Sequence, residues 1–551
     1  MSVDDKFVIY GPDYGGPLPK NTLGQEILES LLSTNGNDIA MEDAFTGRKL
    51  SYKTLLQEVC NLAEALRNYG CLPGTVISVS SENNLEFFIP VLASLLIGCI
   101  VAPINHSYTE TELNHTLNIS KPKVVFCSSE VVDKFVKLKL ELGFIDKIII
   151  IDSNLTVSGN PQTETLKEYV FNSLKGRTVL PYNFRPFVDD TENLGAFILC
   201  SSGTTGLPKG VLLSHLNIMV RIAHSRISDY YFMKKADLGL MPFFHGFGLN
   251  VTLGALLNKD KVIVMKRFDE DIFLKSIQDY KIGTLSLAPP LAVFLEKSPK
   301  VLKYDLSCIE DIICGAAPLS KHTENAIRKR LINLKTLRQG YGLSEATLTI
   351  TMIEKGKQRE GSSGKVMNHM AMKIQDPVSG KSLGPNQVGE ICIKGPLVMI
   401  GYYNNEKATT ETFTSDGWLK TGDLAYYDDE KYFYIVDRLK ELIKYKGYQV
   451  APAELEAILL KHPKVRDVGV VGLPDELSGE LPLAFVVLHD GVSATEKELQ
   501  LYVASLLSPQ KHLRGGVIFI SEIPKNPSGK ILRRILREKA KHCKPRLETK
   551  L

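Results

Sequence analysis

Residues 195–210 read GAFILCSSGTTGLPKG, a short apolar run followed by a loop rich in glycine and hydroxyl groups. Glycine lets the backbone approach a ligand closely, and backbone N–H groups and hydroxyls can bind phosphate oxygens. A lysine near the end of the loop adds a positive point charge. The stretch therefore predicts a phosphate site, whose candidate residues are Ser201, Ser202, Gly203, Thr204, Thr205, Gly206 and Lys209.

This loop departs from the Walker pattern of nucleotide-binding loops. The Walker pattern ends in Lys-Ser or Lys-Thr, whereas Gly210 follows Lys209 here, and the spacing between Gly203 and Gly206 also differs. By composition, the loop is equally compatible with a polar turn between two strands. Other segments of the chain decide between these two interpretations.

Short apolar runs alternate with amphipathic segments on both sides of the loop. Runs of Val and Ile separated by helix-like segments are typical of parallel strands covered by helices. Helices are predicted over 55–70 and 83–96, and strands over 76–80, 99–104, 123–128, 147–152, 196–200, 238–243, 261–266, 282–290 and 309–318. The pattern predicts an α/β fold.

The pattern changes in the second half of the chain. From about residue 371 to 437 it shifts to short strands and turns, which suggests a small β subdomain. A new α+β unit follows the run VDRLKELIKYKGYQVAPAELEAILLKHP, so we place a domain boundary near residues 437–440. The basic segment over 530–546 predicts a solvated terminal helix.

The longest apolar run, residues 87–104, approaches the length of a membrane span. It contains Pro90, Gly98 and Pro103, which interrupt a spanning helix. We therefore expect a buried helix that leads into a buried strand, and no transmembrane segment.

Length and composition indicate an intracellular globular protein of several structural units. The chain has 551 residues, 44% hydrophobic and 23% charged, with a net charge of +4, which gives no reason to expect nucleic acid as the main partner. Its nine cysteines show no C-x-x-C pair, and no secretory signal begins the chain. The last three residues, Thr549-Lys550-Leu551, are similar to a peroxisomal address and predict an import receptor as a partner.

Four further segments carry polar residues that would complement a phosphate loop. Each has a plain structural alternative: a helix N-terminus, a turn aspartate, a charged helix face and a lysine on a mobile loop. A carboxylate close to phosphates usually indicates Mg²⁺, because a bare carboxylate would repel them. The segments are GYGLSEAT (340–347) with Glu345, GWLKTGDLAYYDD (417–429) with Asp423, VDRLKELIKYKGYQVAP (436–452) with Arg438, Lys440, Lys444 and Lys446, and PKNPSGKILRR (524–534) with Lys530.

Together and in this order, these segments resemble the adenylate-forming superfamily of acyl-CoA synthetases, nonribosomal adenylation domains and beetle luciferases. The resemblance covers nearly the whole chain from about Leu23, and is strongest to beetle luciferases and related insect fatty acyl-CoA synthetases. It implies a large N-terminal domain (1–437) of two helix-covered, mostly parallel sheets plus a β-barrel-like subdomain (about 371–437). A hinge at 438–440 would join this domain to a small mobile α+β C-terminal domain (441–551).

The resemblance also implies a reaction in two halves. A carboxylate attacks the α-phosphate of Mg·ATP to give an acyl-adenylate and pyrophosphate, and the thiol of coenzyme A then displaces AMP. The loop from Ser201 to Lys209 would embrace the β- and γ-phosphates, and Glu345 with Thr347 would line the phosphates and Mg²⁺. The adenosine would be held by Gly315, Ala316, Ala317, Gln339, Gly340, Tyr341, Gly342, Asp423 and Arg438, with Asp423 accepting from the ribose hydroxyls.

The mobile domain would contribute one lysine to each half-reaction. Lys530 would bridge the carboxylate and the α-phosphate in the first half, and His245 would gate the acyl and pantetheine approach. Rotation about Lys440 would then withdraw Lys530 and bring the KYKGYQV face, with Lys444, to the site.

The acyl pocket leaves two enzyme classes open. Arg221, His245 and Phe247 match positions that luciferases use beside luciferin. However, Leu348 and Val251 stand where luciferases carry serine and threonine, and Ala316 replaces a glycine. Apolar bulk suits an alkyl chain better than a polar heteroaromatic acid. We therefore favour a fatty acyl-CoA synthetase, with a luciferase as the alternative and a non-catalytic binding protein as a third class.

Overall fold

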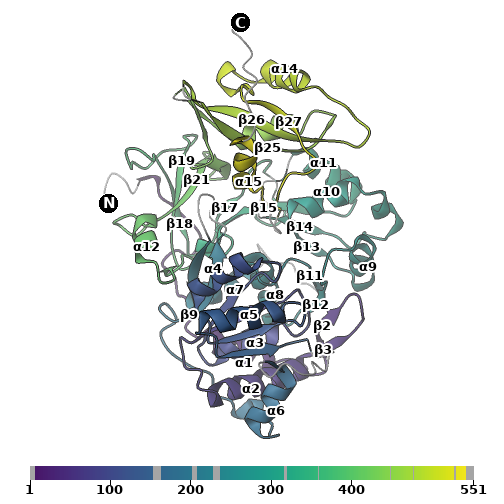
Figure 1. Cartoon of the computed structure of the whole chain (residues 1–551), viewed down its shortest axis with the longest axis vertical. Coiled ribbons are helices and arrows are strands. Elements are labelled where there is room, and N and C mark those ends of the chain that lie inside the picture. The colour runs from purple at the N-terminus through teal and green to yellow at the C-terminus, as the bar shows by residue number, and fades with distance from the viewer. Residues whose placement is uncertain are drawn as a thin grey trace.

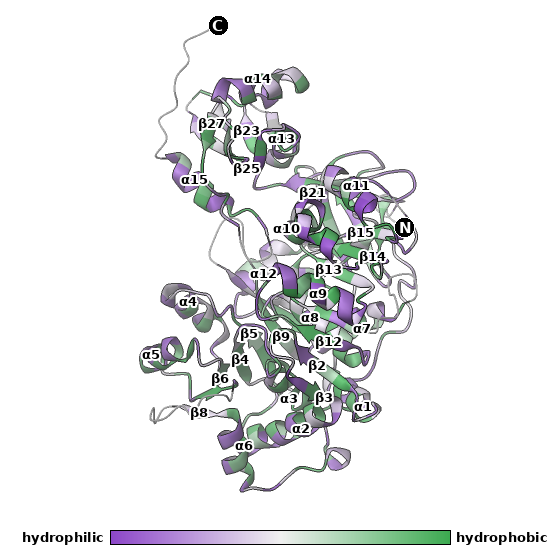
Figure 2. Ribbon diagram, turned by 90° about the vertical axis from the view of Figure 1, so that its right-hand side faces the viewer, coloured by the Kyte–Doolittle hydropathy of each residue, from purple (hydrophilic) through white to green (hydrophobic). Residues whose placement is uncertain are grey.

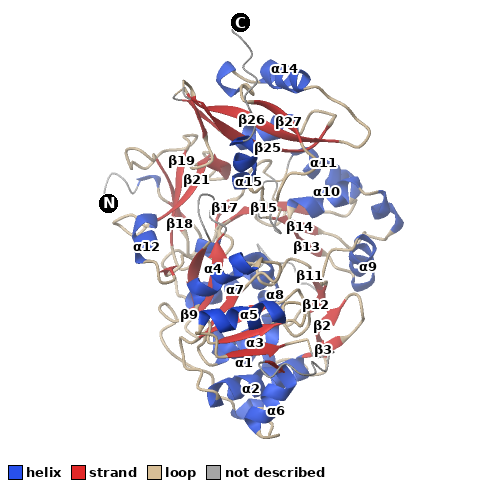
Figure 3. Ribbon diagram, viewed as in Figure 1, coloured by secondary structure: helices blue, strands red, loops and turns tan. Residues whose placement is uncertain are grey.

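The computed structural model describes residues 6–152, 163–201, 208–227, 236–315, 319, 321–357, 359–446, 448–475, 477–525 and 529–541. A large N-terminal body carries a smaller C-terminal lobe at one end, as Figure 1 shows. The described strands form five sheets, most of them covered by helices (Figure 3). The predicted α/β architecture of a large and a small domain is confirmed.

The largest sheet contains the strand that leads into the opening loop. Its order is β20-β10-β9-β5-β4-β6-β7-β8, and all neighbours pair in parallel except β9 with β10 and β10 with β20. Its strands are β4 (Val76–Ser80), β5 (Ile100–Pro103), β6 (Val124–Cys127), β7 (Lys147–Ile150), β8 (Thr163–Thr165), β9 (Gly195–Ser201), β10 (Lys209–Ser214) and β20 (Gly401–Tyr402).

Helix α2, Tyr52–Asn68, illustrates why the helices of this body form where they do. Ser51 caps its N-terminus by accepting from the Thr54 N–H at 3.1 Å. Buried leucines and valines recur every three or four residues, which places them on one face that packs against the core. The other helices of this region are α1 (Leu23–Leu32), α3 (Phe88–Leu96), α4 (Glu110–Ser120), α5 (Val132–Leu142), α6 (Leu166–Leu174), α7 (His215–Ser225) and α8 (Gly246–Leu257).

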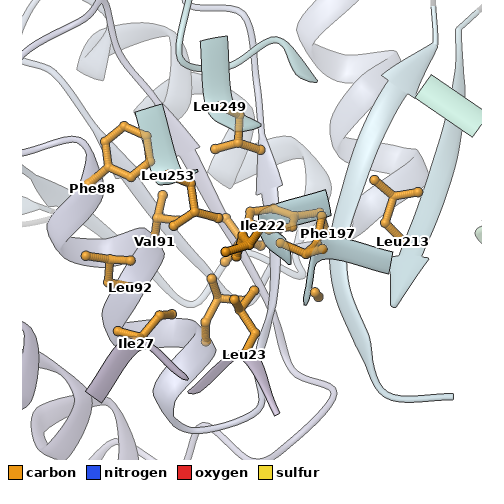
Figure 4. Close-up of a cluster of buried hydrophobic side chains, with 14 of the residues drawn as sticks. Leu23, Ile27, Phe88, Val91, Leu92, Phe197, Leu213, Ile222, Leu249 and Leu253 are labelled. Atoms are coloured by element: carbon orange, nitrogen blue, oxygen red, sulfur yellow. The ribbon is translucent and has the colours of Figure 1, made fainter. Parts of the chain in front are cut away.

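The main hydrophobic core lies between the large sheet and helices α1, α3, α7 and α8 (Figure 4). Burial of one such side chain stabilises the fold by roughly 1.5–3 kcal/mol relative to exposure. The core fixes α7 and α8 relative to β9 and β10. It therefore also fixes the positions of the side chains on these elements that could bind a ligand. Its members include Leu23, Ile27, Val91, Leu92, Phe197, Leu213, Ile222, Leu249 and Leu253.

Two further sheets complete the parallel part of the body. One has the order β11-β12-β2-β3 and the other β13-β14-β15-β16-β17. Their strands are β2 (Ile39–Asp43), β3 (Lys49–Ser51), β11 (Ala236–Gly239), β12 (Lys261–Val264), β13 (Thr284–Leu287), β14 (Asp311–Cys314), β15 (Thr336–Tyr341), β16 (Thr351–Met352) and β17 (Lys365–Val366). Helices α9 (Glu270–Tyr280), α10 (Pro289–Lys297) and α11 (Lys321–Arg330) accompany them.

The β subdomain contains one strand from the beginning of the chain. Its antiparallel sheet has the order β1-β18-β19-β21-β22, with β1 (Ile9–Tyr10) pairing along β18. The other strands are β18 (Ala371–Gln375), β19 (Gly389–Lys394), β21 (Leu419–Tyr427) and β22 (Phe433–Arg438), accompanied by α12 (Glu406–Thr412). The sequence analysis missed β1, because two residues carry too little periodicity to mark a strand.

The C-terminal lobe has its own sheet and its own core, and Figure 2 shows it above the rest of the molecule. The chain enters it through residues 439–442, between β22 and β23. Its elements are β23 (Ile443–Tyr445), β24 (Tyr448–Val450), α13 (Pro452–Leu459), β25 (Val465–Asp475), β26 (Gly479–Leu488), α14 (Glu496–Leu506), β27 (Gly516–Phe519) and α15 (Arg533–Lys541).

The basic terminal helix is not a solvated one, so that prediction was wrong in part. Leu536 and Ala540 on α15 are buried against the lobe, and Leu536 lies close to Gly469 of β25. The side chain of Arg533 is only 10% exposed and forms two ion pairs. Apolar residues four apart give this helix a packing face in spite of its charge.

The apolar run over 87–104 forms helix α3 followed by the buried strand β5, as predicted. However, α3 begins at Phe88 and not near residue 83, because the Asn83 side chain bonds to the backbone of Gly239 and Phe243. The strand predicted over 238–243 is β11, which ends at Gly239. No helix in the described ranges is long and apolar enough to span a bilayer.

Candidate functional site

Asp423 and Arg438 face one another on paired strands of the β subdomain. The register of β21 and β22 sets these residues opposite each other. The Asp423 carboxylate, which is 4% exposed, accepts from Arg438 Nε at 3.0 Å and from the Tyr341 hydroxyl at 2.6 Å. Each carboxylate oxygen keeps a further lone pair, so Asp423 can also accept from ligand hydroxyls.

Tyr341 reaches this carboxylate from the end of β15, in another sheet. Burial, together with the negative charge of Asp423, raises the pKa of Tyr341 well above its usual value. The phenol therefore stays protonated and remains a hydrogen-bond donor. Three predicted adenosine-binding residues thus come together from segments about 80 residues apart.

The predicted adenine residues lie at the carboxyl edge of the parallel strands β13, β14 and β15. Gly315 follows β14, and its N–H donates to the Leu287 carbonyl at 3.1 Å. The register places Cys314 opposite Gln339, so Gly315 lies beside Gly340 at the edge where α/β folds bind ligands. Ala316 and Ala317 lie outside the described residues.

Gln339 anchors the loop after β14 with its side chain. Its Oε1 accepts from the backbone N–H of Leu319 at 3.0 Å. This bond fixes the far end of the loop that begins at Gly315. The structure therefore shows Gln339 as a support for that loop, while a direct contact with adenine stays a prediction.

The turn after β15 is held in a strained conformation. Thr347 and Leu348 have φ angles of 50° and 88°. Residues other than glycine rarely adopt this left-handed region of backbone conformation. Gly342 packs directly on this turn, since a Cβ atom there would lie 1.4 Å from the Leu348 carbonyl oxygen. The Thr347 hydroxyl donates to the Leu397 carbonyl at 2.7 Å, which leaves its oxygen as an acceptor.

Glu345 lies on this turn and is brought to the base of the glycine-rich loop by Tyr402. The Tyr402 hydroxyl donates to Glu345 Oε1 at 3.0 Å, and Lys209 Nζ lies 4.5 Å from the centre of the Tyr402 ring. Lys209 pairs with Ser201 at the loop end of the β9–β10 hairpin. Residues Ser202, Gly203, Thr204, Thr205 and Gly206 lie outside the described residues.

The groups around Glu345 fit a hard divalent cation that arrives with phosphates. Tyr402 occupies one carboxylate oxygen, and Mg²⁺ prefers oxygen ligands, often one or two carboxylates together with substrate phosphates. Among the described residues, no cluster of three His, Cys, Asp or Glu side chains forms a dedicated metal cage. Glu345 would therefore hold Mg²⁺ jointly with the phosphates.

Helices α7 and α8 carry the residues predicted for the acyl pocket. His245 precedes α8 and caps it, because its Nδ1 accepts from the Phe247 N–H at 3.2 Å. Burial lowers the pKa of His245, so the ring is neutral at pH 7. Phe247 is buried, and Val251, one turn further along α8, is half-buried. Burial also lowers the pKa of Arg221 on α7 to about 10.

Lys530 of the C-terminal lobe lies within electrostatic range of the Asp423–Arg438 pair. Burial and the neighbouring positive charge of Arg438 lower its pKa to about 8, while Glu441 and Asp423 act in the opposite direction. The adjacent Gly529 touches the N-terminal body, since a Cβ atom there would lie 2.9 Å from Pro290 Cδ. The lobe thus stands in an orientation that presents Lys530 to the predicted nucleotide residues.

Lys444 and Lys440 lie elsewhere on the lobe and its connection. Lys444 is exposed on β23, and its backbone N–H donates to Glu480 at 2.8 Å. Lys440 lies in the connecting segment and acts electrostatically on Glu390 of β19. The structure therefore separates Lys444 from the cluster that contains Lys530, as two half-reactions on one rotating domain would require.

Two functional features escaped the sequence analysis. Tyr402, which orients Glu345, lies 57 residues away from it in the chain, and no local motif marks the pair. Arg533 binds Glu441 and Glu456 and so ties the start of α15 to the connecting segment and to α13. The only available signal was the position of Arg533 three residues after Lys530.

Comparison with known proteins agrees with this geometry. The family model described as AMP-binding enzyme matches residues 28–403, and that of its C-terminal domain matches residues 454–530. The chain is 42% identical to the luciferin 4-monooxygenase of Photuris pensylvanica over 550 residues, which is 99% of this chain and 100% of the relative. It is 38% identical to probable 4-coumarate–CoA ligase 1 of Dictyostelium discoideum, over 95% and 96% of the two chains.

Two solved forms of one protein superpose on this structure to different extents. ATP-bound MatB from Rhodopseudomonas palustris, 25% identical, superposes with a TM-score of 0.83 over 94% of this chain and 99% of that chain. Apo MatB superposes over the same shares with a TM-score of 0.73. This structure therefore superposes better on the ATP-bound form of that protein than on its apo form.

Proposed function

The chain belongs to the AMP-binding enzyme family, which is the adenylate-forming superfamily, and on this basis we propose that it activates a medium- or long-chain fatty acid with ATP and Mg²⁺ and transfers the acyl group to coenzyme A. The observation that carries the proposal is the approach of Lys530 from the lobe to the Asp423–Arg438 pair. A cation at this place can stabilise charge that develops on the α-phosphate.

In the first half-reaction, a carboxylate oxygen of the acid attacks the α-phosphorus, and the bond to the bridging oxygen of pyrophosphate breaks. Asp423 accepts from the ribose hydroxyls and Lys530 compensates the negative charges of the carboxylate and the α-phosphate. Glu345 would hold Mg²⁺ together with the phosphates, and Lys209 would attract the outgoing pyrophosphate by its charge. These groups act mainly by position and charge, as in other phosphoryl-group chemistry.

In the second half-reaction, the sulfur of coenzyme A attacks the acyl carbon, and AMP leaves with the electrons of the carbon–oxygen bond. The lobe turns about Lys440, so Lys530 withdraws and the strand that carries Lys444 approaches. The neutral ring of His245, at the start of α8, would gate the acyl and pantetheine path. One site thereby serves two reactions in succession.

Two positions support an alkyl chain as the acyl group. Leu348 adds apolar bulk on the turn after β15, and Val251 adds a branched alkyl group on α8. An apolar wall favours an aliphatic acid, because a polar acid would lose hydrogen bonds to water without replacement. Arg221 and Phe247 would contribute the remaining charged and aromatic groups of the acyl pocket.

A panel of C12–C18 acids tests this proposal. We expect ATP-dependent pyrophosphate release and acyl-CoA formation, measured separately, with Mg²⁺ required for the first. Lys530→Ala serves as the inactive control for adenylation. If no acid of the panel gives either product, the fatty-acid assignment fails.

The alternative is a luciferase, which would decarboxylate luciferin oxidatively with light emission. The 42% identity to a luciferin 4-monooxygenase over nearly the whole chain favours this second candidate. The same enzyme preparation should therefore be assayed with D-luciferin, ATP and Mg²⁺. Strong light with little thioester would replace the synthetase proposal, while weak light beside abundant thioester would be a side activity.

We also propose that the protein acts in peroxisomes through Thr549-Lys550-Leu551, which lie outside the described residues. Localisation of the full chain with and without these three residues tests this proposal. We expect the shortened chain to remain in the cytosol.

A further inference from the structure

Helix α13 of the C-terminal lobe is capped by a residue of the other body. The N-cap residue of α13 is Ala451, whose side chain forms no cap bond. Instead, the Ala453 N–H donates to Asp437 Oδ2 at 3.0 Å. The first N–H groups of a helix lack partners within the helix, and a carboxylate there is also favourable to the helix dipole. Asp437 therefore supplies the missing cap.

Asp437 is anchored firmly in the N-terminal body. It lies on β22 opposite Leu424, within the antiparallel sheet of the β subdomain. Its side chain is largely buried, and its Oδ1 accepts from the Arg438 N–H at 2.7 Å. One carboxylate thus binds the backbone on both sides of the connecting segment 439–442.

Apolar contacts also join the two sides of this connection. Leu424 and Val436 of the N-terminal body share a small cluster with Leu439, Leu442 and Ala451. Apolar contacts have no directional requirement and tolerate sliding, whereas a hydrogen bond requires one geometry. Asp437 is therefore a directional contact across the connection, between the N-terminal body and helix α13.

We propose that Asp437 is a positioning residue that holds the lobe in the orientation in which Lys530 faces the Asp423–Arg438 pair. The inference rests on the proposed function, in which the lobe turns about Lys440 between the half-reactions. Asp437 precedes Lys440 and Ala453 follows it, so the turn separates the two groups and breaks their bond. The cap forms in only one of the two lobe orientations. It therefore shifts the equilibrium between these orientations toward the one in which it forms.

Asp437→Ala tests this role through the ratio of the two half-reactions. Loss of one charged cap shifts the balance between orientations roughly 5- to 10-fold toward the thioester-forming one. We expect the rate of thioester formation from supplied acyl-adenylate, divided by the rate of pyrophosphate release, to rise by this factor. Asp437→Asn keeps an oxygen acceptor and should shift the ratio less.

Asp269→Ala is the matched control. Asp269 caps α9 through the N–H groups of Asp271 and Ile272, and all three residues lie in the N-terminal body. Its loss removes a cap of the same kind without crossing the connection. We expect similar thermal destabilisation and an unchanged ratio of half-reactions. A ratio that moves equally in both variants overturns the proposal.

Small-angle scattering of the full chain gives a readout that does not depend on activity. Asp437→Ala should change the scattering profile relative to wild type, because the released lobe samples other orientations, while Asp269→Ala should not. If wild type is inactive on every acid but the profile still shifts, the proposed function fails and the positioning role stands. An unchanged profile together with an unchanged ratio in a folded Asp437→Ala or Asp437→Asn variant refutes the positioning role.

Discussion

Lys530 lies among charges of both signs, and its surroundings explain why a lysine would act there. Burial and Arg438 lower its pKa to about 8, while Asp423 and Glu441 favour the protonated form. The group is therefore a cation at neutral pH that has lost part of its hydration. Such a cation can bind carboxylate and phosphate oxygens with less desolvation than an exposed lysine.

Lys530→Ala should remove most of the adenylation activity. We expect pyrophosphate release to fall roughly 10²- to 10³-fold, the usual effect of deleting one group that stabilises developing charge. Thioester formation from supplied acyl-adenylate should stay largely intact, because Lys530 would have withdrawn in that step. Equal loss in both assays would remove Lys530 from the first half-reaction.

The pH dependence of adenylation should follow the same lysine. Its positive charge is present below the pKa of about 8 and is lost above it. We expect kcat/KM for ATP to decline as pH rises through about 8, since this parameter reports groups of the free enzyme. The decline in kcat should occur at higher pH than the decline in kcat/KM, because bound phosphates favour the protonated form of Lys530. Lys530→Arg should abolish the decline in kcat/KM.

Leu348 offers a test of the choice between the two enzyme classes. It follows Thr347 on the strained turn after β15 and adds apolar bulk there. Leu348→Ser removes this bulk and adds a hydroxyl, so we expect light emission with D-luciferin to rise and acyl-CoA formation from long acids to fall. Leu348→Ala removes the bulk without the hydroxyl and separates the two effects. Unchanged emission in both variants would show that this position does not limit luminescence.

At the scale of elements, the start of α15 and helix α13 are joined by a buried ionic cluster. Arg533 binds Glu441 at 2.8 Å and Glu456 at 2.7 Å. Glu456 also accepts from the Val470 N–H at 2.8 Å. Burial raises the pKa of the Glu456 carboxyl to about 7, although Arg533 favours the ionised form. The cluster connects the helix after Lys530 to the segment that enters the lobe.

The raised pKa of Glu456 makes the stability of the lobe depend on pH. The unfolded carboxyl loses its proton near pH 4.5 and the folded one near 7, so the stabilisation is present below 4.5 and lost as pH rises through 7. We expect this group to lower the free energy of unfolding by on the order of 3 kcal/mol across that window. Urea unfolding of wild type and Glu456→Gln at pH 5 and pH 8 measures the difference.

A neighbouring glutamate on α13 provides the control for this prediction. Glu454 is half-buried, with its side chain 39% exposed, and pairs with Lys511 at 2.7 Å. Glu454→Gln should preserve the pH dependence of wild type, whereas Glu456→Gln should flatten it. A slope that persists in Glu456→Gln would assign the pH dependence to another group.

At the scale of the molecule, the two bodies meet so that one lysine faces the site and the other faces solvent. Lys530 lies within electrostatic range of the Asp423–Arg438 pair, and Lys444 is exposed on β23. The whole chain superposes better on the ATP-bound form of MatB, with a TM-score of 0.83, than on its apo form, with 0.73. A rotation of the lobe would exchange the two lysines.

Lys444→Ala therefore tests the rotation. We expect thioester formation from supplied acyl-adenylate to fall by about 10-fold or more, because the strand that carries Lys444 would reach the site in that step. Pyrophosphate release should change little. Lys446→Ala, two residues further along, is a control for the charge of the segment. An unaffected thioester rate in Lys444→Ala would count against the rotation.

Much of the fold was readable because its signals are local. The alternation of Val/Ile runs with amphipathic segments predicted the α/β body, and the apolar run over 87–104 formed the expected helix and strand. Strand β1 and the packing of α15 were not readable, since a two-residue strand and a highly charged helix acquire their roles from distant partners. Periodicity reports which face is buried and not what buries it.

The candidate site, like the fold, was predictable from the sequence only in part. The sequence by itself determined which groups could do the chemistry: the hydroxyl-rich loop ending at Lys209, and the motif residues Glu345, Asp423 and Lys530. Only the tertiary structure decided that Tyr341 bonds Asp423, that Tyr402 holds Glu345 and that Asp437 caps α13 across the connection. A motif can be recognised because its residues are close together in the sequence. Hydrogen bonds between residues 16 to 82 positions apart form only when the sheets and the lobe pack together. The loop therefore predicted a phosphate site, and the packing of the two bodies brought Lys530 into electrostatic range of the Asp423–Arg438 pair.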